Sequence, residues 1–338
     1  MTEIVIRQSV IDAGIVADTV ARSSVFHTEL SKRPANTLAS YRVDLQTWCC
    51  YLESCNVECA GDWFNDPTRW AGVTFGLVQG FASWLLREGY AIATVNRKLS
   101  TVRHFSALAG KAGVIPSATL SEIREVKVIS FADGINIDQK RERKRLGSKK
   151  VKATPIGTDQ AHSLKTGQPQ SPQGWRDALI MCLLLDHGLR AGEAVLLTVD
   201  AFSIADETFT FYRPKVSKVQ NHKLTKDTLC ALRSYLAADG APSAGKLLVG
   251  SRKGGQLSGK AITRENLSRR VASLGKAIGI DHLSAHDCRH YWATTATRNK
   301  TNPLALKQAG GWNSIAMVSR YVEESEISNI GVNLGGNE

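Results

Sequence analysis

Three segments in the C-terminal half of the chain combine side chains that could act together on an anionic group. They contain two arginines, a histidine, a tryptophan and a tyrosine: Arg190, His286, Arg289, Trp312 and Tyr321. Glu193 follows Arg190 by one helical turn and can orient its guanidinium, while His286 and Arg289 share one side of an expected helix start. Guanidinium groups bind anionic oxygens, imidazole transfers protons near neutral pH, and an activated phenol is a nucleophile. Each segment alone is a weak signal.

A mixed set of elements must position these side chains. The apolar stretch 175–186 predicts a buried helix, 208–213 alternates like a strand, and 246–249 suggests a second short strand. Helical patterns return later, over 263–278, over 287–298 and from Asn313 onward. The second half of the chain therefore predicts an α-rich domain with a small antiparallel sheet.

The N-terminal part of the chain predicts a purely helical domain. After Asn36, a good N-cap, apolar residues recur at helical steps of three and four: Leu38, Tyr41, Leu45, Trp48 and Leu52. A second helix carries Val78 and Leu85, and a third begins near Thr94. On that third helix, Arg97, Lys98 and Arg103 are expected away from the apolar stripe. They suit contacts with phosphates, although a solvated surface fits the pattern equally well.

Length and charge bound the class of protein. The chain has 338 residues, of which 43% are hydrophobic, so it predicts two globular domains rather than a disordered or fibrous chain. Its net charge is +12, which favours a polyanionic partner because each basic residue that neutralises a phosphate releases a counterion. The longest apolar run, 178–185, is too short to cross a bilayer, and residues 1–20 lack a secretory core. We therefore expect a cytoplasmic, DNA-associated protein with no membrane contact.

A cluster of basic residues marks the boundary between the two halves. Between Lys140 and Lys152, eight basic residues accompany the single acidic Glu142. Such a run repels itself and predicts an extended interdomain linker. The residues expected to bind DNA there are Lys140, Arg141, Lys144, Arg145, Lys149 and Lys150.

The cysteines predict neither a disulfide framework nor a metal site. There are seven, an odd number in a long chain, which favours reduced thiols. Four of them crowd together without a Cys-x-x-Cys pair or a histidine partner: Cys49, Cys50, Cys55 and Cys59. We expect no metal and no other cofactor.

Taken together, the motifs resemble those of the tyrosine recombinase and integrase family, which includes the Cre-like and Xer-like site-specific recombinases. That family has an arginine in a Gly-Leu-Arg-x-x-Glu segment, a lysine on a β-hairpin, a His-x-x-Arg box, a histidine or tryptophan, and a tyrosine nine residues after it. The matching residues here are Arg190, Glu193, Lys215, His286, Arg289, Trp312 and Tyr321. Segments 36–45 and 94–100 are similar to the family's helical core-binding domain.

The resemblance implies a role for each of these residues. Arg190 and Arg289 would offset charge on the non-bridging oxygens of a DNA phosphate, and Tyr321 would form a 3′-phosphotyrosyl ester. His286 would exchange the phenolic proton, whereas Trp312 can only donate a hydrogen bond. His290 and Glu193 would support the site.

The general acid on the hairpin is open between two lysines. In the segment 211–218, the family pattern favours Lys215, which would protonate the leaving 5′ oxygen. The register is loose because Pro214 stands where glycine is often found, so Lys218 is the alternative.

The resemblance also implies a domain plan. It comprises an N-terminal extension at 1–25, a helical SAM-like core-binding domain at 26–130, a basic linker at 131–173, an α-rich catalytic domain of the DNA breaking–rejoining fold at 174–325, and a tail at 326–338. Four protomers would assemble on two double-stranded DNA sites and exchange strands through a Holliday junction. In that assembly the apolar tail residues Ile327, Ile330 and Leu334 would dock on a neighbour.

Three other activities compete with this interpretation. A type IB topoisomerase or a telomere resolvase shares the chemistry, but the His-x-x-Arg box and the tryptophan spacing favour a recombinase. A non-catalytic DNA-binding protein of the same fold is disfavoured because every catalytic position is filled. A metal-dependent nuclease lacks the carboxylate cluster that such chemistry needs. The target site, the biological role and any accessory proteins stay open.

Overall fold

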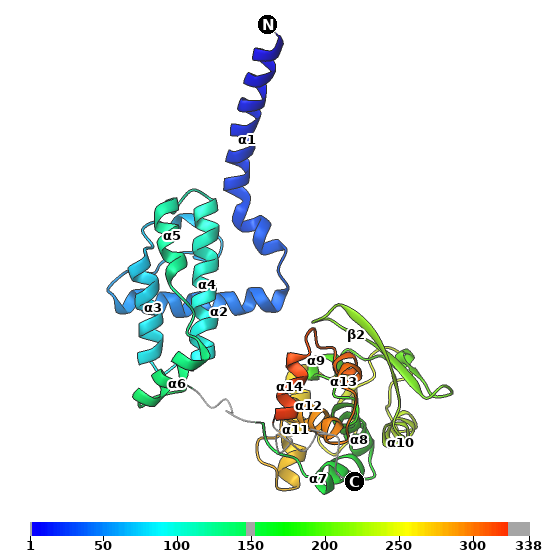
Figure 1. The fold of residues 1–338 in the computed structure, drawn as a ribbon. Coiled ribbons are helices and arrows are strands. Elements are labelled where there is room, and N and C mark those ends of the chain that lie inside the picture. Colours follow the sequence, from blue (N-terminus) through cyan, green and yellow to red (C-terminus); the bar gives the residue numbers. More distant parts are fainter. Residues whose placement is uncertain (1, 147–152, 324–338) are drawn as a thin grey trace, which may run out of the picture. The chain divides into compact units, whose positions relative to one another are not determined.

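A computed structural model of the chain describes residues 2–146 and 153–323 (Figure 1). The chain divides into two compact units, Met1–Lys149 and Lys150–Glu338. The fold is mainly α with small antiparallel sheets and a helical N-terminal domain, which confirms the predicted fold class. No described helix is both long enough and apolar enough to cross a bilayer.

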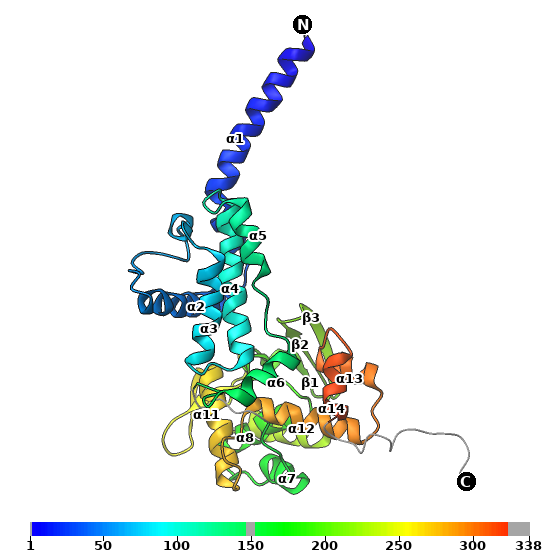
Figure 2. The ribbon, with the colours of Figure 1, turned by 60° about the vertical axis from the view of Figure 1, so that its left-hand side comes forward.

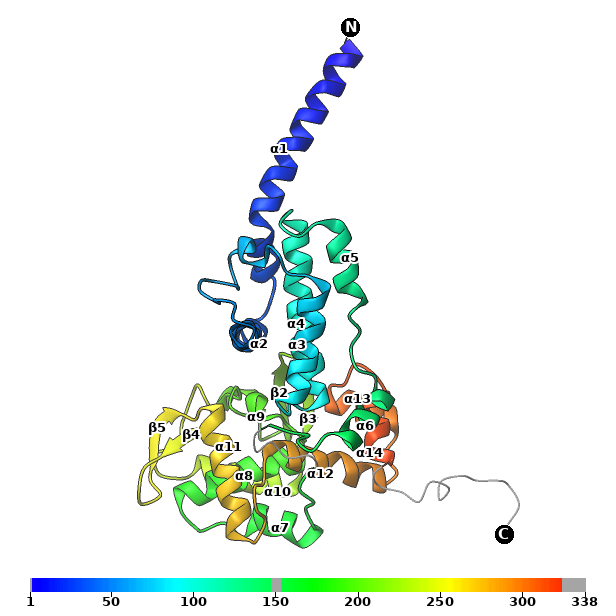
Figure 3. The same ribbon diagram turned by 90° about the vertical axis from the view of Figure 1, so that its left-hand side faces the viewer.

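The first unit is a helical bundle. Its elements are α1 (Thr2–Ser31), α2 (Ala35–Ser54), a 3₁₀ turn η1 (Pro67–Trp70), α3 (Phe75–Arg87), α4 (Ile92–Lys111), α5 (Ser117–Glu125) and α6 (Phe131–Lys140). The apolar stripe predicted on α2 is buried around Trp48, which packs against Trp70 and Phe81. Figures 2 and 3 show the N-terminal part of α1 running past the other helices of this unit, and residues 10–23 are exposed.

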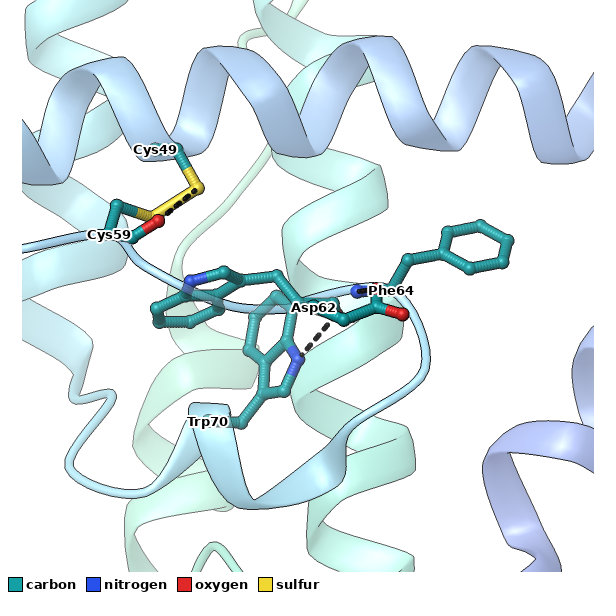
Figure 4. Close-up of a disulfide and its surroundings, with 6 residues drawn as sticks. Cys49, Cys59, Asp62, Phe64 and Trp70 are labelled. Carbon is teal, nitrogen blue, oxygen red and sulfur yellow. Dashed lines mark hydrogen bonds between the residues drawn. A yellow bond between two sulfur atoms is a disulfide. The ribbon is translucent and has the colours of Figure 1, made fainter.

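A disulfide joins Cys49 to Cys59, so the expectation that all cysteines are reduced is wrong for this pair (Figure 4). The chain turns back at Asn56, whose φ of 60° is left-handed, and this reversal brings the two Cα atoms to 5.3 Å, a normal disulfide spacing. The loop that follows is fixed by the Trp70 indole, which donates to the carbonyl of Trp63. The disulfide therefore ties α2 to the loop that supports the aromatic core. Among the described residues, no three potential ligands of histidine, cysteine, aspartate or glutamate cluster as a metal site.

The second unit surrounds one buried helix. Its helices are α7 (Thr158–Thr166), α8 (Pro172–Leu185), α9 (Ala191–Ala194), the 3₁₀ turn η2 (Val199–Ala201), α10 (Lys226–Leu236), α11 (Arg264–Ala277), α12 (Ala285–Arg298), α13 (Pro303–Gly310) and α14 (Ala316–Glu323). The strands β1 (Phe202–Ser203), β2 (Thr208–Arg213) and β3 (Lys218–Lys223) form one antiparallel sheet, and β4 (Val249–Ser251) pairs with β5 (Leu257–Ala261). Residues 176–185 of α8 are all buried, which explains why the run 178–185 is apolar on every side.

The segment 131–173, which we expected to be an interdomain linker, contains helical structure. It contains α6 in the first unit and α7 in the second. Ala161 and Leu164 of α7 are buried in the core of the second unit, and this burial stabilises a short helix that the polar sequence around it did not suggest.

Candidate active site

Arg190 and Glu193 form the first part of the site. After α8 the chain turns through Gly188, whose φ of 61° suits glycine, and Arg190 becomes the N-cap of α9. Glu193 Oε2 accepts from the Arg190 backbone N–H at 2.9 Å, and Arg190 Nη1 donates to Glu193 Oε1 at 2.6 Å. The predicted pairing is thus present. Burial opposes ionisation of Glu193, but the charge of Arg213 and the bonds from Arg190 outweigh it and hold the carboxyl pKa below its usual value.

Arg289 lies on the first turns of α12 and is only 2% exposed. Its Nη1 donates to the carbonyl of Gly188 at 2.6 Å, and its Nη2 donates to the carbonyl of Gly310 at 2.5 Å. The guanidinium also lies over the Trp312 ring, 4.6 Å from the centroid. Burial, together with the charges of Arg190 and Arg213, lowers the pKa of Arg289 to about 9, so it stays charged at neutral pH.

Tyr321 lies on α14 within a small aromatic cluster. Its ring centroid is 5.4 Å from that of Trp312 and 5.0 Å from that of His290. Tyr321 is 7% exposed and Trp312 is 8% exposed. Trp312 follows the left-handed Gly311, which ends α13 and turns the chain toward α14. His290 therefore packs edge-on against the Tyr321 ring.

His286 lies one helical turn before Arg289 at the start of α12. Ser284 and Asp287 form a capping box there, which fixes where the helix begins. Desolvation and the charge of Arg289 lower the pKa of His286 below its ordinary value. A neutral imidazole at physiological pH can accept a proton.

Lys215 and Lys218 are exposed at the end of the β2–β3 hairpin. Lys215 lies in the turn, and Lys218 is the first residue of β3, opposite Arg213. Both lysines thus lie at the hairpin end where the sequence predicted the general acid.

Arg213 is a site residue that the sequence did not single out. It is fully buried at the end of β2, and its Nη1 donates to Glu193 Oε2 at 2.6 Å. A signal was available, because the alternation of Phe209, Phe211 and Arg213 puts this arginine on the buried face of the strand.

The basic residues predicted to bind phosphate have different environments. Lys98 is 3% exposed and paired with buried Asp44 at 3.1 Å, so its predicted outward position is wrong. Its spacing from Val95 and Val102 places it on their buried face. Arg97 is half-exposed and also binds Asp44. Arg103 donates to the carbonyl of Arg124. Arg141 pairs with Asp138 and donates to the carbonyls of Leu86, Tyr90 and Lys144. Lys140 and Lys144 are exposed, and Arg145 is partly buried. Lys149 and Lys150 lie outside the described residues, as do tail residues Ile327, Ile330 and Leu334.

The sequence matches two family models. Residues 156–326 match the Phage integrase family, and residues 26–113 match the Phage integrase, N-terminal SAM-like domain. Over 301 residues the chain is 23% identical to the tyrosine recombinase XerC of Roseiflexus sp. (strain RS-1), covering 87% of this chain and 85% of that protein. Over 154 residues it is 34% identical to the XerC of Methylobacterium sp. (strain 4-46), covering 44% and 45% of the two chains.

Two solved structures share the fold. The Tn1549 transposon integrase in complex with a circular intermediate DNA superposes with a TM-score of 0.63 at 15% identity, covering 89% of this chain and 94% of that one. A lambda integrase dimer bound to a COC′ core site gives a TM-score of 0.58 at 15% identity, covering 97% and 83%.

Proposed function

This chain belongs to the phage integrase family and is a site-specific tyrosine recombinase, and on that premise we propose which of its residues cut and rejoin DNA. One observation carries the proposal. The buried Arg289 guanidinium touches the turn before Arg190, the end of α13 and the ring of Trp312, which itself packs on Tyr321. Groups from distant parts of the second unit therefore converge on one place.

Tyr321 is the nucleophile in this proposal. Its phenolic oxygen forms a bond to phosphorus, and the bond from phosphorus to the 5′ oxygen breaks, which leaves a 3′-phosphotyrosyl ester and a free 5′ hydroxyl. The phenolic proton passes to His286, and the leaving oxygen takes a proton from Lys215. Attack by another 5′ hydroxyl reverses the step, so rejoining needs no ATP.

Arg190 and Arg289 bind the non-bridging oxygens of the phosphate as negative charge grows on them. A guanidinium is a rigid fork of donors, and Arg289 uses two different nitrogens for its carbonyl contacts. Remaining N–H groups on both arginines can face the phosphate. The indole N–H of Trp312 donates a further hydrogen bond. This chemistry requires no metal ion.

The partner is double-stranded DNA that carries recombination sites. We place four protomers on two sites, with strands exchanged in pairs through a Holliday junction. The exposed basic residues near α6 and Lys149 and Lys150 beyond it contact phosphates. Because so little of Tyr321 is exposed, α14 must shift for the phenol to reach phosphorus.

Trapping the covalent intermediate tests the nucleophile. The DNA site is first mapped from covalent attachment to DNA that flanks the gene, and a nicked duplex containing that site then releases the cut strand irreversibly. We expect Tyr321→Phe to lose the covalent complex, because phenylalanine has no oxygen to form the ester. The exposed Tyr212 on β2 gives a matched control, and Tyr212→Phe should trap DNA as the unmodified chain does. Covalent complex at normal yield with Tyr321→Phe would refute the assignment.

A further inference from the structure

Arg213 makes contacts with three separate parts of the site. Besides Glu193, its Nη2 donates to the carbonyl of Ala309 at 2.7 Å, and its Nε donates to the side chain of Gln220 on β3. Its guanidinium also lies over the Phe211 ring at 4.7 Å. No surface of this side chain is exposed. Each of the three guanidinium nitrogens of Arg213 therefore donates a hydrogen bond to a different residue.

The hairpin is fastened to the end of α13 by a second contact. The Nε2 of Gln220 donates to the carbonyl of Gln308. The two chains approach closely here: a Cβ on Gly311 would meet the Cδ of Arg213 at 2.5 Å. The next residue after Gly311 is Trp312. Both strands of the hairpin are thus held by the segment that places the aromatic cluster.

We propose that Arg213 is a positioning residue for recombination, which fixes the lysine-bearing end of the β2–β3 hairpin against the Glu193 carboxylate that orients Arg190. The inference rests on the proposed function above. Arg213 is the last paired residue of β2, two residues before Lys215 and directly opposite Lys218. Its contacts therefore fix the position and orientation of the β2–β3 turn relative to Glu193. This holds whether Lys215 or Lys218 donates the proton.

The alternative is that Arg213 only stabilises the fold. Arg176 offers a matched comparison, because it is also buried, binds a carboxylate at Asp177 and donates to the carbonyl of Val249. None of these partners belongs to the proposed active site. A purely structural arginine should behave like Arg176 when substituted.

The experiment compares two leaving groups. Arg213→Lys keeps the charge but cannot form the three-way fork, and Gln220→Ala removes the second tie without removing an arginine. Single-turnover cleavage is measured on the normal nicked duplex and on one with a 5′-bridging sulfur, whose thiolate needs no proton donor. DNA affinity and thermal unfolding are measured for each folded variant.

Both variants should cleave the oxygen substrate at least about 10-fold more slowly than the unmodified chain and recover most of that loss on the sulfur substrate. Arg176→Lys should change the cleavage rates of the oxygen and sulfur substrates by the same factor, or leave both rates unchanged. The inference would be overturned if folded Arg213→Lys and Gln220→Ala cleaved the oxygen substrate at a rate within twofold of the unmodified chain. It would also be overturned if their cleavage rates fell equally on the oxygen and sulfur substrates. If the unmodified chain forms no covalent complex with either substrate, the proposed function itself fails.

Discussion

Glu193 links the two arginines on either side of it. One oxygen of its carboxylate faces Arg190 and the other faces Arg213, with both distances at 2.6 Å. A third guanidinium lies in this region, because Arg289 is close enough for Arg190 and Arg213 to lower its pKa. The positive charge of these groups favours binding of a phosphate diester.

Substitution of single lysines on the hairpin distinguishes Lys215 from Lys218 as the proton donor. We expect Lys215→Ala to bind DNA normally and to cleave the oxygen substrate at least about 100-fold more slowly, since general acid catalysis typically contributes that much. On the bridging-sulfur duplex the rate should return. If the bridging-sulfur duplex restored the cleavage rate of Lys218→Ala but not that of Lys215→Ala, Lys218 would be the general acid.

Some site residues could be predicted from the sequence because local rules place them. The Arg190–Glu193 pair follows from helical spacing, and the same rule places His286 and Arg289 on one side of α12. The carbonyls that hold Arg289 lie far away in sequence and could not be predicted, because they depend on tertiary packing. Lys98 shows the opposite error: an ionic side chain was expected outside, but a buried aspartate holds it within the bundle.

At the scale of elements, α2 and α4 are joined by the ion pair of Asp44 with Lys98. Asp44 also accepts from Thr101 at 2.9 Å and from Arg97. We expect Asp44→Ala to lower the free energy of unfolding of the first unit by about 3–5 kcal/mol, since it leaves Lys98 buried without its carboxylate. Lys98→Met should cost less, because Asp44 keeps two other partners. Urea unfolding measures both, and equal losses in the two variants would contradict this account.

The second unit should be acid-sensitive through the end of α8. Burial, and to a smaller degree His222, lowers the pKa of His187 to about 3, and His187 lies within 3.0 Å of the Thr228 hydroxyl. The unfolded chain binds this proton near pH 6.5 but the folded chain does not, so stability is lost as pH falls below that value. At pH 5 the loss from this residue is about 2 kcal/mol.

Urea unfolding of the second unit at pH 7.5 and pH 5 tests this expectation. His187→Asn, which keeps a polar group, should reduce the difference between the two pH values. His162→Asn changes an exposed histidine on α7 and should leave the difference intact. An unchanged acid loss in His187→Asn would assign the sensitivity to other groups.

The sequence predicted long elements better than short ones. The apolar stripes of α2, α4 and α8 are strong over many residues, so their helices were predictable. In contrast, α9 has four residues and α13 has eight, and only their end residues carry a local signal, such as the Arg190–Glu193 capping box and the left-handed Gly311. Weak intrinsic helix formation in such short stretches leaves the decision to packing.

At the scale of the whole molecule, the net charge of +12 predicts how DNA affinity responds to salt. If six or more phosphates are contacted, affinity should fall by about 10³-fold between 50 and 200 mM salt. Lys144→Gln removes an exposed charge and should reduce the slope by about one contact. Lys98→Met should leave the slope unchanged, because that lysine is buried. Affinity that does not vary with salt would contradict phosphate-dominated binding.

The last carbonyls of α13 affect what a truncated form of the protein would do in a cell. The carbonyls at the end of α13 accept hydrogen bonds from side chains of the site: Gln308 from Gln220, Ala309 from Arg213, and Gly310 from Arg289. The site residues and this helix end therefore satisfy each other's hydrogen-bonding groups. A stop codon ahead of this turn would remove more than the nucleophile. In the shortened product Arg213 and Arg289 would each lose one of the carbonyl oxygens that accept from their guanidiniums, which leaves buried N–H groups unsatisfied, and proteases would degrade it. Premature termination should therefore produce a simple absence of enzyme, and no poison subunit that occupies recombination sites without cutting them.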